Sequence, residues 1–276
     1  ADYNAYFLNY RLIATGYSYF DFDPFFNILM KIGATLHLEY NVFLTIICLV
    51  MYTLMFGILF RNNNYKIHSI ILLYTIYSFF IDAIQISNFI SNVFSIIFLF
   101  IMFEYKKNPE KKLLFLSSIS LIFAIGFHTS AVALVPFYFF VKSNKTNVFA
   151  MGAVAFACCD TLLKHSFVNI LFNRIPYLRA YSGLSYYGEK IHSGWGFLIY
   201  LVIILAMIGL VKYSKYEKDC NELVNFLQYV LVLTPVMVIS TISYTRFFRV
   251  MMVAYSCFYN KINARRLKKD FYIGIV

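Results

Sequence analysis

The chain has 276 residues, of which 61% are hydrophobic and 13% are charged, and its mean hydropathy is +0.69. Soluble domains are roughly 45–50% apolar and about 25% charged, so this composition excludes an ordinary soluble domain and favours a lipid environment. The formal net charge of +11 requires no nucleic-acid partner, because basic loops between apolar stretches account for most of it.

Apolar stretches long enough to cross a membrane follow one another along the chain. A spanning helix needs about 20 such residues, and shorter ones occur in packed bundles. The predicted spans are 40–60, 67–83, 88–104, 112–127, 129–141, 147–163, 195–212, 223–242 and 246–260, with a truncated further one from residue 271. Residues 112–141 alternatively form one broken hairpin through His128. The sequence therefore predicts an all-α, polytopic transmembrane helix bundle of about nine to ten spans in a single domain, 1–276.

Two longer segments, 1–39 and 164–194, are rich in Tyr, Asn, Gly and Ser. Within them, residues 25–38 and 167–178 carry apolar side chains at helical spacing, which predicts amphipathic helices lying in the membrane interface. The chain begins at Ala1 and stops inside an apolar run. We therefore expect a fragment that lacks an N-terminal helix and most of a C-terminal helix.

Basic residues mark one side of the predicted bundle. Alternate loops at 61–66, 104–112, 142–147, 212–222 and 261–270 hold 16 of the 24 Lys and Arg residues but only 6 of the 13 acidic residues. Because basic loops stay in the cytoplasm, both long segments face outward. The elaboration of the outward segments predicts that the functional site lies on the outer face of the membrane.

Neither cysteines nor common motifs indicate a metal or a cofactor. The five cysteines form no CxxC pair and lie mostly in apolar runs, so we interpret them as free thiols that act as small hydrophobic residues. Walker A, GxGxxG, HExxH and GxSxG patterns are absent from the sequence. We expect no cofactor.

Ionisable and polar residues gather at the outer ends of the spans, where burial makes them functional hypotheses. Asp82, Gln85 and Asn88 belong to a polar band that serves either a ligand or interhelical hydrogen bonds. His128 lies between two apolar runs, where it is either a hydrogen-bonded interface residue or a group suited to acid–base chemistry near neutral pH. Asp23, before Pro24, is either a helix cap or a site residue.

Four arginines lie on the outer side, where the charge rule disfavours them. Arg174 and Arg179 are in the second long segment, and Arg246 and Arg249 share one helix face at spacing i,i+3. Guanidinium groups bind phosphate through a planar fork of donors, although snorkelling toward lipid headgroups is the alternative interpretation.

These pieces, in this order, resemble the EpsG-like family of Wzy-type bacterial polysaccharide polymerases. The resemblance rests on residues 2–6, 23–26, 84–90, 127–131, 173–181 and 246–249 and covers nearly the whole chain. It implies a metal-independent enzyme that joins polyprenyl-diphosphate-linked oligosaccharide units at the outer face of the bacterial cytoplasmic membrane. A flippase and a chain-length regulator are the protein partners that it suggests, beside the lipid bilayer.

The resemblance assigns expected roles to the outer residues. Arg174, Arg179, Arg246 and Arg249 would bind the diphosphate. His128 is the first candidate to activate the acceptor hydroxyl, followed by Asp23 and Asp82. Asp2, Tyr6, Gln85, Asn88 and Tyr181 are the candidates for binding the glycan.

Two departures from the family pattern and two rival functions stay open. The family often has Glu-Pro-Gly-Phe where this chain has Asp-Pro-Phe-Phe at 23–26, and an Arg where this chain has Ser87. A membrane glycosyltransferase that uses a polyprenyl-phosphate sugar would place an acidic residue in the first outer segment, as this chain does. A lipid-linked oligosaccharide flippase would instead carry polar residues through the membrane centre and show repeated halves.

Overall fold

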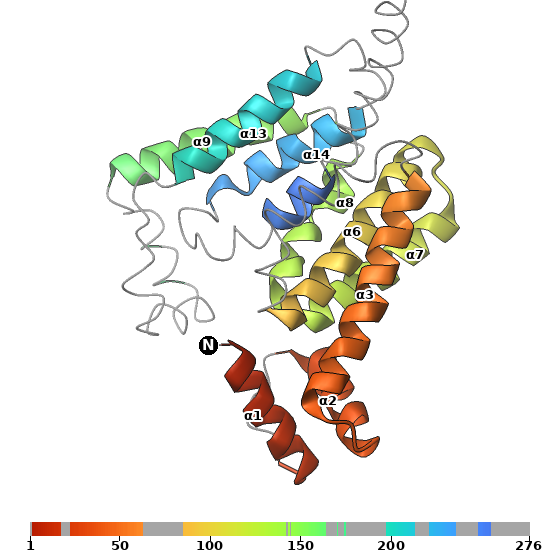
Figure 1. The fold of residues 1–276 in the computed structure, drawn as a ribbon. Coiled ribbons are helices and arrows are strands. Elements are labelled where there is room, and N and C mark those ends of the chain that lie inside the picture. Colours follow the sequence, from red (N-terminus) through yellow and green to blue (C-terminus); the bar gives the residue numbers. More distant parts are fainter. Residues whose placement is uncertain are drawn as a thin grey trace, which may run out of the picture. The chain divides into compact units, whose positions relative to one another are not determined.

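The computed structural model of the chain describes residues 2–17, 23–62, 85–141, 143, 145–163, 170, 174, 197–212, 221–235 and 248–254. The named elements there are α1 (Asp2–Ala14), α2 (Pro24–Thr35), α3 (Tyr40–Asn62), α6 (Ile86–Lys107), α7 (Lys111–Phe127), η2 (Thr129–Leu134), α8 (Phe137–Phe140), α9 (Thr146–Leu162), α13 (Phe197–Lys212) and α14 (Asn221–Val232) (Figure 1). These residues contain no strand, so the all-helical prediction is confirmed for the described part of the chain.

Most predicted spans coincide with helices. The stretches at 40–60, 88–104, 112–127, 147–163 and 195–212 became α3, α6, α7, α9 and α13, and α14 covers the first half of 223–242. Two helices of the described residues are long and apolar enough to cross a membrane, Tyr40–Leu59 and Ile86–Lys107. The predicted span at 67–83 and the run from 271 lie outside the described residues, and only 248–254 of the span at 246–260 is described.

The stretch at 112–141 is not one continuous helix. α7 ends at Phe127, and His128 is extended with φ −159° and ψ 126°. The short 3-10 helix η2 follows, and Pro136 precedes α8. The break at His128 fits both predictions for this stretch, two separate spans and one broken hairpin, so both stay predictions.

The chain divides into two compact units, one made of residues 1–135 with 252–276 and the other of residues 136–251. The interpretation of the chain as a single membrane-embedded domain stays a prediction.

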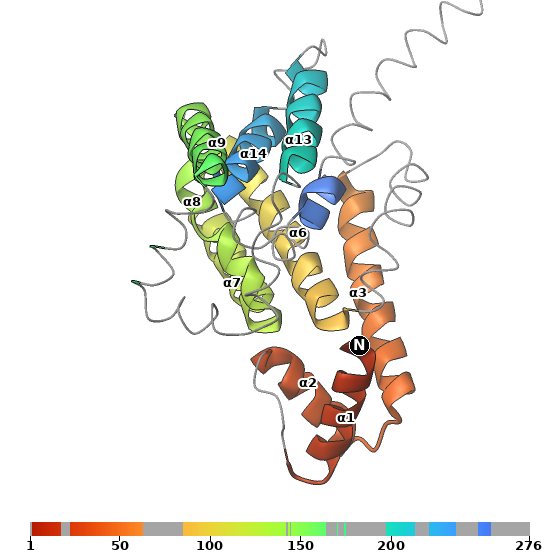
Figure 2. The same ribbon diagram turned by 90° about the vertical axis from the view of Figure 1, so that its left-hand side faces the viewer.

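In the first unit, α6 and α7 form an antiparallel hairpin closed by the turn at Asn108–Glu110 (Figure 2). Ser87, Ser91 and Ser95 recur every fourth residue along α6 and are all buried. Ser91 donates through Oγ to the Ala124 carbonyl at 2.8 Å. Small residues let helices approach closely, and each hydroxyl can bind a carbonyl of the neighbouring helix, so the serine row packs α6 against α7.

α3 lies on another side of α6, where Tyr52 contacts Phe89 with ring centroids 4.6 Å apart. α6 is mostly buried, whereas α3 leaves Val42, Ile46 and Leu49 exposed on its outer side. A long helix with an exposed apolar side has the surface expected for lipid contact.

The amphipathic helix predicted at 25–38 is α2, which begins at Pro24 and ends at Thr35. It buries Phe26, Asn27, Met30 and Gly33. Ile28 and Ile32, from the predicted apolar stripe, remain exposed. The helix therefore packs through one face and keeps an apolar face outside, as a helix in a membrane interface would. The second predicted amphipathic stretch, 167–178, has only residues 170 and 174 described.

α1 packs against α2 and forms a hydrogen bond to the loop that follows α2. Tyr10 donates to the Leu38 carbonyl at 2.8 Å, and burial raises the pKa of the Tyr10 phenol, so this hydroxyl stays protonated and available as a donor. Asn9 Nδ2 donates to Asn27 Oδ1 at 3.2 Å, which pairs two buried amides across α1 and α2.

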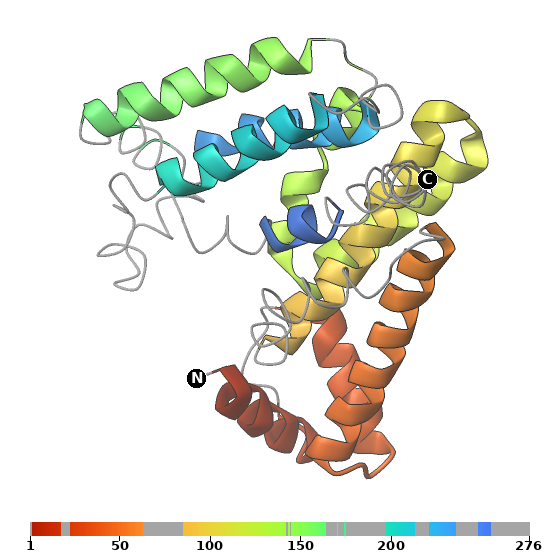
Figure 3. The same ribbon diagram turned by 45° about the horizontal axis from the view of Figure 1, so that its top comes forward.

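The second unit contains α8, α9, α13 and α14 (Figure 3). Phe137 contacts Phe226 and Tyr229 in its interior. Asn225 Nδ2 donates to the carbonyls of Phe140 and Val141 at 3.0 and 2.9 Å. The last carbonyls of a helix have no partner within it, so Asn225 caps α8 from α14.

Gly126 of α7 is covered by the ring of Phe25. A Cβ built at Gly126 would lie 2.4 Å from Phe25 Cδ2, which is closer than van der Waals contact permits. We expect Gly126→Ala to lower the free energy of unfolding by about 1–3 kcal/mol through overpacking, measured by thermal denaturation in detergent. Gly57→Ala in α3 is the matched control, because a Cβ there meets nothing within 4 Å and should be neutral or stabilising. Equal destabilisation by both substitutions would contradict this packing.

Candidate functional site

Polar groups from three segments meet at the end of the α6–α7 hairpin that lies away from its turn. Ser87 Oγ lies 2.5 Å from Asp23 Oδ2 and 2.7 Å from the Phe127 carbonyl oxygen. Tyr6 adds a fourth segment, since its hydroxyl donates to Asp23 Oδ2 at 3.3 Å. We call Tyr6, Asp23, Ser87 and the Phe127 carbonyl the polar cluster; His128 is the next residue after Phe127.

Asp23 occupies the predicted N-cap position before α2, but its side chain makes no capping hydrogen bond. Only its backbone serves the helix, because the Asp23 carbonyl accepts from Asn27 N at 3.0 Å. The carboxylate instead reaches Ser87 and Tyr6. Of the two interpretations that the sequence left open, side-chain capping is wrong.

Ser87 is fully buried, at 0% exposure, and its hydroxyl has one hydrogen for two acceptor oxygens. It donates either to Asp23 or to the Phe127 carbonyl. Both contacts are hydrogen bonds at the same time only if a proton also lies between Asp23 and Ser87. A proton added between Asp23 and Ser87 would therefore keep both contacts of the Ser87 hydroxyl.

His128 is half-buried and held by its own backbone. Its N–H donates to the Ala124 carbonyl at 2.9 Å, and its carbonyl accepts from Ala131 N at 3.1 Å. Its ring nitrogen Nδ1 accepts a hydrogen bond from Ser130 N at 3.1 Å and lies 3.0 Å from Ser130 Oγ. The side chain thus caps the first turn of η2.

Next to the cluster, the start of α6 carries the predicted polar band. Asn88 is 2% exposed, and its Nδ2 donates to Gln85 Oε1 at 3.4 Å. Asn88 Oδ1 is buried without a hydrogen-bond partner. A buried acceptor without a donor is unfavourable, which makes Asn88 a position where an incoming hydroxyl group would be stabilised.

Aromatic rings surround the cluster and fix its segments. Phe25, two residues after Asp23, makes edge contacts with Phe123 and Phe127 at centroid distances of 5.5 and 5.7 Å. Tyr6 contacts Phe26 in the same way at 5.1 Å. These contacts dock the start of α2 on the end of α7 and so position the Asp23 carboxylate.

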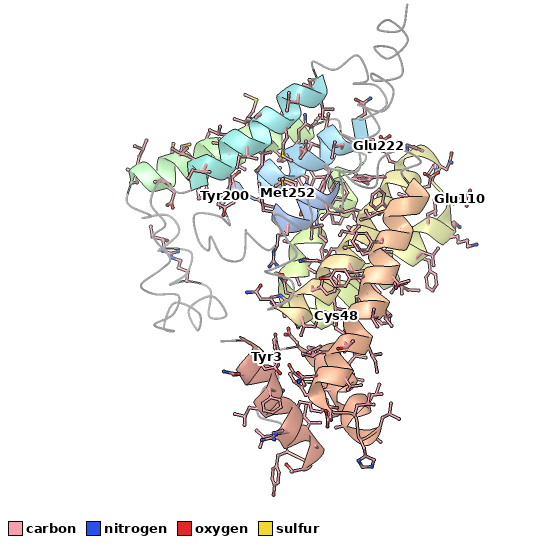
Figure 4. All side chains as sticks on the ribbon, in the orientation of Figure 1. Tyr3, Cys48, Glu110, Tyr200, Glu222 and Met252 are labelled. Atoms are coloured by element: carbon pink, nitrogen blue, oxygen red, sulfur yellow. The ribbon has the colours of Figure 1, made fainter. Side chains whose placement is uncertain are left out.

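The hairpin is polarised along its length. Lys106 and Lys107 end α6, Lys111 and Lys112 begin α7, and Glu110 lies in the turn between them. Figure 4 shows Glu110 at one end of the first unit and Tyr3, on α1, toward the other end. At 1.5 Å rise per residue, the 22 residues of α6 separate the basic turn from the polar cluster by about 30 Å.

The other predicted site residues lie in the second unit, at the start of α1, or outside the described residues. Arg174 is exposed and Arg249 is 3% exposed, and both belong to the second unit. Asp2 begins α1. Asp82, Arg179, Tyr181 and Arg246 lie outside the described residues. Among the described residues, no group of three or more His, Cys, Asp and Glu side chains could hold a metal ion.

Sequence reasoning did not select Ser87 as a site residue, although it noted the position. The sequence signal for Ser87 was the repeat of serines at 87, 91 and 95, which places three hydroxyls on one face of α6. The structure buries all three. The contact from Asn9 to Asn27 was also missed, and no spacing in the sequence indicates it.

Ser87→Ala should weaken the first unit, because it leaves the Phe127 carbonyl and Asp23 without the hydroxyl. We expect a loss of about 1–3 kcal/mol in the free energy of unfolding, measured by chemical denaturation in detergent. Thr45→Ala is the matched control, since the exposed Thr45 hydroxyl bonds only to a carbonyl of its own helix and should change stability by about 0.5 kcal/mol or less. A loss no greater than that of the control would rule out a bridging role for Ser87.

Comparison with known proteins places the chain in one family. The family model described as the EpsG family matches residues 1–276. That family is associated with polysaccharide polymerase-like proteins. No curated protein and no solved structure matches the chain.

Proposed function

Because the chain belongs to the EpsG family, we propose that it joins polyprenyl-diphosphate-linked oligosaccharide units into a polysaccharide at the outer face of the bacterial cytoplasmic membrane. The observation that supports a site is the meeting of four segments on which the family resemblance rests, contributed by Tyr6, Asp23, Ser87 and Phe127. Residues far apart in the sequence thus form one polar cluster in an otherwise apolar unit.

The topology supports an outward site. α3 and α6 are long enough to span a membrane, and α3 exposes an apolar side. The basic turn between α6 and α7 should remain in the cytoplasm. The polar cluster, at the other end of the hairpin, then faces outward. The proposed bundle contains about nine to ten spans, with α2 lying in the outer interface.

The proposed reaction is a glycosyl transfer. A hydroxyl of the acceptor unit attacks the anomeric carbon of the donor chain, a glycosidic C–O bond forms, and the bond from that carbon to the diphosphate breaks. The site must take the hydroxyl proton and stabilise the charge that develops on the departing diphosphate. His128, Asp23 and Asp82 are the proposed acid–base residues, and Arg174, Arg179, Arg246 and Arg249 are proposed for the diphosphate.

The glycan would bind beside these groups. Asn88 contributes a buried carbonyl oxygen that lacks a hydrogen-bond donor, and Tyr6 lies next to Asp23. Gln85, Asp2 and Tyr181 complete the proposed contacts. The lipid-linked unit must reach the outer leaflet first, so a flippase is the expected supplier and a chain-length regulator the expected partner.

Loss of the protein should shorten the polymer without stopping synthesis of its repeat unit. In cells that lack the gene, the full-length protein should restore long chains. Arg249→Ala should reduce their rate of appearance by about 10²-fold or more, because a donor to the developing charge is lost. Arg249→Lys keeps the charge without the planar fork and should recover only part of the activity. Arg11→Ala, at an exposed residue of α1, is the control that should retain wild-type polymer length.

Polymer length would be read on gels, with membrane levels of each variant checked in parallel. Single repeat units that remain inside the cell would contradict the polymerase and indicate a flippase. Transfer from a polyprenyl-monophosphate sugar would indicate the other glycosyltransferase class.

A further inference from the structure

If the proposed function holds, some residue must take the proton of the acceptor hydroxyl, and the tautomer of His128 decides whether that residue can be His128. The imidazole of His128 has two nitrogens, and a neutral ring carries a hydrogen on only one of them. Only the nitrogen without hydrogen can act as a base. The partners of Nδ1 therefore decide what chemistry remains for Nε2.

Nδ1 of His128 faces a group that can only donate. The backbone N–H of Ser130 lies 3.1 Å from it and has no lone pair to offer. The Ser130 hydroxyl, whose Oγ lies 3.0 Å from Nδ1, can also donate to it. The backbone donor requires a lone pair on Nδ1, so in the neutral ring the hydrogen is on Nε2. The lone pair that a general base needs is already engaged in the cap of η2, and Nε2 is a hydrogen-bond donor.

The ring has little freedom to leave this arrangement. The backbone of His128 is bonded on both sides, to Ala124 and Ala131, and the preceding carbonyl of Phe127 contacts Ser87. A 180° flip of the ring would place Cδ2 where Nδ1 now lies, against the Ser130 N–H, and would forfeit the cap. The backbone thus fixes the tautomer as well as the position of the side chain.

Asp23, in contrast, can take up a proton. Its Oδ2 lies 2.5 Å from Ser87 Oγ, and Ser87 also contacts the Phe127 carbonyl. When Asp23 is ionised, the single hydrogen of Ser87 serves one of the two oxygens. When Asp23 gains a proton, it donates to Ser87, and Ser87 turns its hydrogen to the Phe127 carbonyl. Rotation of one hydroxyl therefore accommodates an added proton.

We propose that Asp23 accepts the proton of the acceptor hydroxyl and that His128 donates a hydrogen bond from Nε2 to an anionic oxygen of the diphosphate. The acceptor oxygen forms the new bond to the anomeric carbon, its proton passes to Asp23, and the diphosphate leaves with the electron pair of the broken C–O bond. The proton later passes from Asp23 to water or to the released diphosphate.

Two substitutions at His128 separate a donor from a base. The amide nitrogen of His128→Gln has about the reach of Nε2 and can donate, but it cannot accept a proton. The carboxylate of His128→Glu can accept a proton, but it cannot donate when ionised and repels a diphosphate. The donor role predicts that the Gln variant polymerises about 10-fold or more faster than the Ala variant, and that the Glu variant is as inactive as the Ala variant.

The experiment measures the rate at which long chains appear after induction in cells that lack the chromosomal gene and supply their own lipid-linked repeat units. His128→Ala should lower this rate by about 10²–10³-fold, and Asp23→Asn, which removes the proton acceptor, by about 10²–10⁴-fold. Thr129→Ala, at the exposed neighbour of His128, is the matched control and should keep the wild-type rate. Membrane levels of all variants are measured by immunoblot.

The outcomes distinguish this inference from the proposed function. If the wild-type protein restores long chains but the Glu variant exceeds the Gln variant, or the Gln variant equals the Ala variant, His128 is not the donor. If Asp23→Asn keeps the wild-type rate, Asp23 is not the base. If cells without the gene make long chains at the normal rate, the proposed polymerase function fails and the inference fails with it.

Discussion

The first unit depends on bringing polar groups together where water is excluded. In apolar surroundings a backbone carbonyl or a carboxylate needs a protein partner, because no solvent replaces one. The Ser87 hydroxyl lies within hydrogen-bond distance of both groups, the Asp23 carboxylate before α2 and the Phe127 carbonyl at the end of α7, and donates its one hydrogen to either. The break at His128 and the docking of α2 both depend on this position. The contacts of Ser87 that hold α2 and α7 together therefore involve the same Asp23 carboxylate that is proposed for the chemistry.

Much of the helical architecture could be predicted from the sequence, because long apolar runs and a basic turn determine α3, α6 and α7 with little ambiguity. The face of α2 that packs was not predictable. Ile28 and Ile32 of the predicted apolar stripe stay outside, while Phe26, Asn27, Met30 and Gly33 lie inside. In a membrane protein apolar character does not distinguish a packed face from a lipid-facing one, so periodicity locates the helix but not its neighbours.

The site shows a similar division. Asp23 and His128 stand out in sequence because charged or titratable groups are rare among apolar residues. Their partners depend on tertiary contacts: Ser87 is 64 residues from Asp23 and 40 from Phe127. The family pattern that the chain resembles often has an arginine where this chain has Ser87. In this structure position 87 faces the Asp23 carboxylate, where a guanidinium would pair with that acid.

The contact between Phe25 and Gly126 has a consequence for how this family varies. The ring occupies the volume that any side chain at 126 would need, whereas the family pattern often has glycine at the position of Phe25. The two positions share one fixed volume, so a chain with glycine at 25 has room for a side chain at 126. We expect the pair to covary among relatives. Where both are small, we expect a hollow beside the carboxylate at position 23.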